Sequence, residues 1–153
     1  HGNVNNMVTA VGRLHPDMII HLGDCWADAE QLHRKFPMTI MEQVPGNCDC
    51  RQDILERILL IEGKKILICH GHTFNVKAGY LNLEYAAEER KVDAALFGHT
   101  HRVFYDKHNR IAYMNPGSIG QPPYGIPPSY GVLQVDGSSN TIATDVIYLE
   151  ENN

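Results

Sequence analysis

The chain has 153 residues, of which 43% are hydrophobic and 20% charged; this balance excludes a disordered segment and predicts a single globular domain over residues 1–153. The net charge is −5 and the Lys and Arg residues form no cluster, so we expect no binding to a nucleic-acid backbone. There is no run of about 18 apolar residues, and the four cysteines show neither CxxC spacing nor the density of a secreted scaffold. We therefore expect no membrane span, and free thiols in a reducing cytoplasm.

The first half of the chain alternates helical and strand patterns. The predicted elements are, in order, a helix over 6–14 capped by Asn3 or Asn5, a strand over 18–20, a helix over 27–35 and a strand over 39–44. Residues 53–61 fit a helix or a strand, and the isoleucines favour a strand in the second half of this segment. The turn signal Glu62-Gly63-Lys64 then predicts a hairpin with residues 65–69.

The second half is mostly strand. Its predicted elements are a helix over 80–90 and strands over 94–97, 103–106, 111–114, 130–135 and 141–148. A loop rich in Gly and Pro, over residues 116–128, interrupts them and is expected to shape substrate access or to form a scaffold or oligomer contact. The whole order predicts an α/β fold of two packed mixed β-sheets flanked by helices.

The segment Gly98-His99-Thr100-His101 directly follows the apolar run at 94–97. A loop at a strand end can aim two imidazoles at one point, and imidazole is the commonest metal-binding side chain. Taken alone, these four residues fit a metal-binding loop and a pair of surface histidines equally well.

Four predicted strands end in loops that carry ligand-type side chains. These side chains are Asp24, Asn47, His70, and the pair His99 and His101. In open α/β sheets ligands bind beyond the carboxyl ends of the strands, so the four loops are expected to converge. Oxygen and imidazole donors together suit Mn²⁺, Fe or Zn²⁺ better than Mg²⁺ or Ca²⁺. So many donors exceed the needs of one tetrahedral ion and favour two ions about 3.5–4 Å apart that share a carboxylate.

The order and spacing of several short motifs resemble one family over essentially the whole chain. The motifs are His1-Gly2-Asn3, Gly23-Asp24, Gly46-Asn47, His70-Gly71-His72, Gly98-His99-Thr100-His101 and Asn115-Pro116-Gly117-Ser118. This series resembles that of the calcineurin-like metallophosphoesterases, in particular the small YfcE-like phosphodiesterase branch.

The resemblance implies a centre of two divalent metal ions, with Mn²⁺ favoured and Fe, Zn²⁺ or Ni²⁺ as alternatives. Asp24 would bridge the ions; the remaining ligands would be Asn47, His70 and His99 for one ion, and His1 and His101 for the other. In the family a strand and an Asp precede the equivalent of His1. We therefore expect that an N-terminal strand is missing from this sequence and that the second ion site is incomplete in it.

The resemblance also implies the reaction and the groups that assist it. The expected activity is hydrolysis of a phosphodiester, or of a phosphomonoester, in a small phosphorylated substrate, by a hydroxide held between the ions. Asp24, Asn47 and His72 are the candidate catalytic residues, with His72 either protonating the leaving group or hydrogen-bonding to a ligand. Many relatives carry His-Glu where this chain has Cys48-Asp49, and a thiol is a poor general acid.

Three neighbours of these residues carry further expectations. Asp49 is expected to orient a ligand histidine. Period-2 alternation predicts that Cys25 and Cys69 point away from the site.

The alternative function is a protein-interaction scaffold of the same fold, like retromer's phosphoesterase-like subunit. The lack of a leaving-group histidine favours the scaffold slightly. The four nitrogen ligands favour the enzyme more, because a scaffold has no need of them all. A homo-oligomer is compatible with either function.

Overall fold

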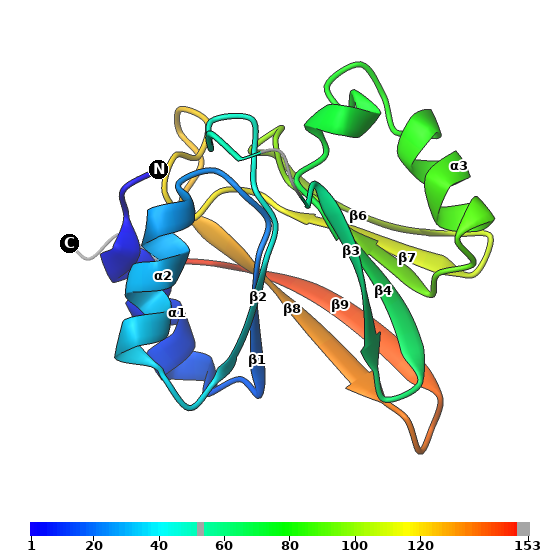
Figure 1. Cartoon of the computed structure of the whole chain (residues 1–153), viewed down its shortest axis with the longest axis horizontal. Helices are drawn as coiled ribbons and strands as arrows, with labels where there is room; N and C mark the ends of the chain where they lie inside the picture. Colours follow the sequence, from blue (N-terminus) through cyan, green and yellow to red (C-terminus); the bar gives the residue numbers. More distant parts are fainter. Residues whose placement is uncertain (52–53, 150–153) are drawn as a thin grey trace.

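The computed structural model describes residues 1–51 and 54–149 (Figure 1). Helix α1 (Val4–Leu14) begins two residues before the predicted start because Asn3 is the residue that caps it. The Asn3 side chain accepts a hydrogen bond of 3.2 Å from the Asn6 backbone N–H, which satisfies one of the free donors of the first turn.

The first sheet is a parallel ladder of two strands, β1 (Met18–His21) and β2 (Ile40–Gln43), joined by helix α2 (Trp26–Lys35). Helices α1 and α2 lie side by side against this ladder (Figure 1). Their shared core consists of Met7, Val11 and Leu32, with Ile19 and Met41 of the strands packed against it. Both predicted helices and both predicted strands are confirmed.

Strands β3 (Glu56–Ile61) and β4 (Lys64–Cys69) form the predicted hairpin. Its turn residues Glu62 and Gly63 have φ of 49° and 79°, the left-handed conformation that a tight two-residue hairpin turn requires. The second half of the ambiguous segment is therefore a strand, as predicted, whereas residues 54 and 55 precede the strand and residue 53 lies outside the described residues.

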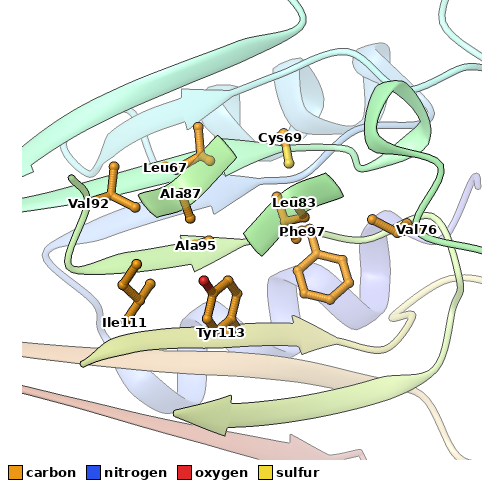
Figure 2. Close-up of a cluster of buried hydrophobic side chains, with 10 residues drawn as sticks. All are labelled: Leu67, Cys69, Val76, Leu83, Ala87, Val92, Ala95, Phe97, Ile111 and Tyr113. Atoms are coloured by element: carbon orange, nitrogen blue, oxygen red, sulfur yellow. The ribbon is translucent and has the colours of Figure 1, made fainter. Parts of the chain in front are cut away.

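The main sheet has five strands in the order β3-β4-β5-β7-β6. Strands β5 (Ala94–Leu96) and β7 (Ile111–Pro116) run parallel to β4, and β6 (Val103–His108) closes the edge as an antiparallel strand. Side chains alternate between its two faces, because successive residues of a strand point in opposite directions. One face carries Leu67, Ala95 and Phe97 and is covered by helix α3 (Leu81–Glu89), as Figure 2 shows.

The opposite face of the main sheet packs on the other β layer. Its side chains, Ile66, Ile68 and Leu96 among them, contact Ile20 of β1. They also contact side chains of the antiparallel ladder formed by β8 (Ser129–Asp136) and β9 (Thr141–Tyr148). The second layer therefore consists of two two-stranded ladders (Figure 1). The predicted α/β fold of packed sheets flanked by helices is confirmed. Of the described sheets only the five-stranded one is mixed, whereas two mixed sheets were predicted.

Two further features complete the description. A short 3-10 helix, η1 (His72–Phe74), follows β4. Within residues 1–51 and 54–149, no helix has the length and apolar character that crossing a membrane would take.

Candidate metal centre

The predicted ligand residues follow the carboxyl ends of four strands. Asp24 lies beyond β1, Asn47 beyond β2, His70 directly after β4, and His99 and His101 beyond β5. Strands β1 and β2 are parallel, as are β4 and β5, and the two ladders pack on each other through their inner faces. The four loops therefore meet at one end of the sandwich, as the sequence predicts.

One group of side chains gathers around Nε2 of His70. This nitrogen lies 3.1 Å from Oδ1 of Asn47, 3.2 Å from Nδ1 of His99 and 3.4 Å from Oδ2 of Asp24. His70 is almost completely buried, whereas His99 is partly exposed. Three of the four residues that the resemblance assigns to one ion thus contact the fourth, His70.

A second group gathers on the other side of the same carboxylate. Nε2 of His1 lies 3.4 Å from Oδ2 of Asp24 and 3.2 Å from Nε2 of His101. The donor atoms of His1, Asp24 and His101 all lie within 4.8 Å of one another, close enough to surround one cation. Oδ2 of Asp24 therefore faces both groups at the same distance.

The backbone fixes which oxygen of Asp24 faces the histidines. The side chain is 5% exposed, and its Oδ1 accepts a hydrogen bond of 3.0 Å from the Cys48 backbone N–H. Asp24, His99 and His101 all adopt the left-handed conformation, with φ of 62°, 67° and 58°. This conformation is uncommon outside glycine, and the strain it stores is typical of functional loops.

Backbone carbonyls orient two of the imidazoles. Nδ1–H of His70 donates to the carbonyl of Leu22 at 2.7 Å, and Nδ1–H of His101 donates to the carbonyl of Gln121 at 2.8 Å. A histidine that donates from Nδ1 presents the lone pair of Nε2, which is the form that binds a metal.

The chemistry of the cluster fits a cation. The lone pair of His70 faces an amide oxygen and a carboxylate oxygen, and these groups are acceptors as well. Burial, and then the proximity of His70, lowers the pKa of His99 to about 4, and burial lowers the pKa of His70; both shifts favour the neutral ring that can bind a metal. Converging acceptors repel one another unless positive charge lies between them, so a divalent ion complements this donor set.

Two glycines permit the loops to approach this closely. A Cβ on Gly23 would lie 2.7 Å from the Gly46 nitrogen and 2.8 Å from Nδ1 of His70, and a Cβ on Gly46 would collide with the Asp24 carboxylate. These two positions therefore admit no side chain.

Sequence reasoning missed the role of Asn115. Its side chain is completely buried, and Nδ2 donates to the Gly98 carbonyl and to Oγ1 of Thr100, both at 2.9 Å. Its Oδ1 accepts from the Gly117 N–H at 3.0 Å, so Asn115 ties the histidine loop to the next turn. The motif Asn115-Pro116-Gly117-Ser118 marks this position in the sequence, but it does not predict which groups the Asn115 side chain hydrogen-bonds to.

Sequence reasoning also missed Asp28. This residue is 8% exposed, and its carboxylate accepts a hydrogen bond of 2.7 Å from the Gly2 N–H, which anchors the segment that carries His1. Its position in the first turn of α2 gives no sequence signal for this contact.

Two expectations for neighbouring residues are wrong. Cys25 does not point away, because its Sγ lies 3.9 Å from Nδ1 of His1. The chain has left the strand here, with left-handed φ at Asp24 and Cys25, so period-2 alternation no longer applies. Asp49 does not orient a ligand histidine; its oxygens accept the backbone N–H groups of Trp26 and Gly46 at 2.7 and 2.8 Å.

The third neighbour, Cys69, meets its expectation, and His72 lies beside two of the predicted ligands. Cys69 points into the core beneath α3, as predicted (Figure 2). The His72 ring centroid lies 5.4 Å from that of His70 and 6.1 Å from that of His99. Its Nδ1 is buried and has no hydrogen-bond partner among the described residues. The role of His72 stays a prediction.

The fold and this donor set define a metal-dependent phosphoesterase domain. The profile of the family described as "Calcineurin-like phosphoesterase superfamily domain" matches residues 1–138. The chain belongs to this family, and membership implies divalent metal ions.

Named relatives agree with this assignment. The chain is 35% identical over 128 residues to the "Probable metallophosphoesterase YsnB" of Bacillus subtilis, covering 82% of this chain and 73% of the relative. It is 30% identical over 114 residues to "Phosphodiesterase YfcE" of Escherichia coli, covering 74% of this chain and half of the relative's length (50%).

Solved structures share the fold. A predicted phosphoesterase of Streptococcus pneumoniae superimposes with a TM-score of 0.77 at 25% identity, over 97% of this chain and 84% of that one. Vps29 of Entamoeba histolytica complexed with Zn²⁺ superimposes with a TM-score of 0.68 at 19% identity, over 92% and 88% of the two chains, and shows the fold alone.

Proposed function

We propose that the protein hydrolyses phosphodiester bonds in small phosphorylated substrates, with phosphomonoesters as the alternative substrates, at a centre for two divalent ions. The observation that carries the proposal is the position of Asp24 Oδ2, which lies 3.4 Å from Nε2 of both His1 and His70. One carboxylate oxygen between two separate groups of donors is the arrangement that a bridged pair of ions needs.

The ligands would divide between the two ions by position. Asn47, His70 and His99 would hold one ion, His1 and His101 would hold the other, and Asp24 would touch both. The mixture of oxygen and imidazole donors favours Mn²⁺, with Fe, Zn²⁺ or Ni²⁺ as alternatives. When bound, such ions lower the pKa of water and offset negative charge on the phosphoryl oxygens.

The protein's own groups would position the ligands and handle the leaving-group proton. Asn115 and the carbonyls of Leu22 and Gln121 hold the imidazoles in orientation. Cys48 is unsuited to proton donation, because desolvation and the Asp24 charge raise the pKa of its thiol. His72, beside His70 and His99, would either protonate the leaving group or hydrogen-bond to a ligand.

A second candidate function is a protein-interaction scaffold. The observation that favours it is the similarity of fold to Vps29. The four imidazoles support the enzyme more strongly, because protein contact alone does not require four histidines around a buried carboxylate.

Assay of the full-length protein with Mn²⁺ on a nitrophenyl phosphodiester and on nitrophenyl phosphate separates the two functions. The enzyme predicts diester turnover that His99→Ala abolishes and that His108→Ala, a change at an exposed histidine at the end of β6, leaves intact. Binding of two ions without turnover of either ester would overturn the enzyme and favour the scaffold.

A further inference from the structure

The turn that joins Asp24 to helix α2 also holds the segment that carries His1. Asp28 lies in the first turn of α2, and its Oδ2 accepts hydrogen bonds from the Gly2 backbone N–H at 2.7 Å and from the His1 backbone nitrogen at 3.3 Å. Sγ of Cys25, in the same turn, lies 3.9 Å from Nδ1 of His1. The main chain and the ring of His1 therefore both contact this turn.

The usual roles of an acidic residue in the first turn of a helix do not account for these contacts. Such a carboxylate typically interacts with the helix dipole at the surface, or accepts a hydrogen bond from the N-cap backbone in a capping box. Asp28 is 8% exposed, and its carboxylate faces a chain segment 26 residues away instead. Burial of a carboxylate is unfavourable unless hydrogen bonds compensate for it, so the contact with residues 1 and 2 is what stabilises this position.

The same turn fixes the shared carboxylate. Oδ1 of Asp24 accepts a hydrogen bond from the Cys48 backbone N–H. The Asp28 backbone N–H donates to the Cys25 carbonyl at 2.8 Å, which closes the turn. The turn therefore places His1 against Asp24, and Nε2 of the imidazole lies 3.4 Å from Oδ2 of the carboxylate.

The other group of donors is positioned independently of Asp28. Asn47 lies beyond β2, His70 directly after β4, and His99 beyond β5. Loss of the Asp28 contact should therefore disturb the donors on one side of Asp24 only.

We propose that Asp28 is a positioning residue for one of the two ions, the ion of His1 and His101. Its oxygen holds the backbone of residues 1 and 2, and this contact keeps the His1 imidazole beside the shared carboxylate. An amide oxygen can replace the carboxylate oxygen in this role, because the donor is a backbone N–H. The inference rests on the proposed function, since it concerns one of the two ions of that centre.

Mn²⁺ binding to the full-length protein, measured by titration calorimetry, tests the inference. Asp28→Ala should weaken the binding of one ion about 10- to 100-fold, as loss of a group that orients a ligand typically does, and leave the other ion unchanged. Asp28→Asn keeps an oxygen acceptor and should bind both ions with nearly wild-type affinity. At a Mn²⁺ concentration that fills the wild-type centre, electron paramagnetic resonance should show an exchange-coupled pair in wild type and Asp28→Asn, and single ions in Asp28→Ala.

Glu84→Ala is the matched control, because it removes an acidic residue from the first turn of another helix, α3. It should bind two ions as wild type does. Asp28→Ala with wild-type affinity for both ions, or Asp28→Asn as deficient as Asp28→Ala, would overturn the inference. The contact also requires slow hydrogen exchange of the Gly2 amide in metal-free wild type, so unprotected exchange would overturn the inference even if Asp28→Ala did not fold.

Turnover of the two nitrophenyl esters by the same proteins separates this inference from the proposed function. Selective loss of one ion in Asp28→Ala, with no turnover of either ester by wild type, keeps the inference and overturns the proposed hydrolysis. Diester turnover by wild type, with both ions bound normally in Asp28→Ala, overturns the inference alone. A single ion in wild type overturns both.

Discussion

Asn115→Ala should destabilise the protein and loosen the loop that carries His99 and His101. The substitution removes the three hydrogen bonds of the side chain, to the Gly98 carbonyl, Thr100 Oγ1 and the Gly117 N–H. It also leaves a cavity at a position with 0% exposure.

The expected loss follows from these contacts. A typical hydrogen bond contributes about 0.5–1.5 kcal/mol, and a buried backbone group left unpaired is unfavourable by about 1–3 kcal/mol. In the variant, a small shift of the backbone would let some of the unpaired backbone groups hydrogen-bond to water. We therefore expect the free energy of unfolding to fall by about 2–4 kcal/mol. Mn²⁺ affinity should fall as well, since both imidazoles stand on the loop that Asn115 holds.

Urea unfolding of the metal-free protein measures the first effect, and titration calorimetry with Mn²⁺ measures the second. Asn5→Ala, at an exposed position of α1, is the control and should change stability by less than about 0.5 kcal/mol. Asn115→Ala with stability equal to that control would refute the role assigned to this side chain.

Three further predictions concern the same centre. Gly46→Ala should lower both Tm and metal affinity, measured by thermal unfolding and calorimetry, because its Cβ would overlap the carboxylate and the backbone nitrogen of Asp24. Unchanged stability and affinity would contradict the close packing of the two loops. In metal-free protein, the pKa of His99 is lowered to about 4 in the folded state, whereas it is about 6.5 in the unfolded state. The unfolded state therefore binds more protons between these values. The free energy of unfolding should fall as the pH drops from about 6.5 to 4. His99→Asn should flatten the dependence of Tm on pH in this window, and a slope equal to wild type would count against the lowered pKa. Cys48→His should raise kcat at least tenfold on alkyl diesters, whose leaving group needs a proton donor, and much less on nitrophenyl diesters. Equal effects on the two esters would show that the lack of a proton donor at position 48 does not limit the rate.

The regular elements could be predicted because their patterns are local. The hairpin of β3 and β4, for example, is encoded by two apolar runs and by two turn residues that adopt left-handed φ. The convergence of Asp24, His70 and His99 could also be predicted, because carboxyl ends of parallel strands meet at one edge.

The remainder depends on contacts between distant segments. Asn115 and Asp28 bond to backbone groups 17 and 26 residues away, and no sequence pattern names such partners. The error at Cys25 has a local cause, since strand alternation was extended into a left-handed turn. The errors therefore fall in loops, where neither helical nor strand periodicity applies, and the omissions concern side chains in α2 and β7 whose partners lie in distant segments.

The central claim is that one carboxylate, Asp24, serves two ions held by different histidines. The most direct test is the metal content of the full-length protein after reconstitution with Mn²⁺, measured by mass spectrometry for wild type, His99→Ala, His101→Ala and Asp24→Ala. The shared carboxylate predicts two ions per chain in wild type, one in each histidine variant and none in Asp24→Ala. One ion in wild type, or as much metal in Asp24→Ala as in His101→Ala, would contradict it.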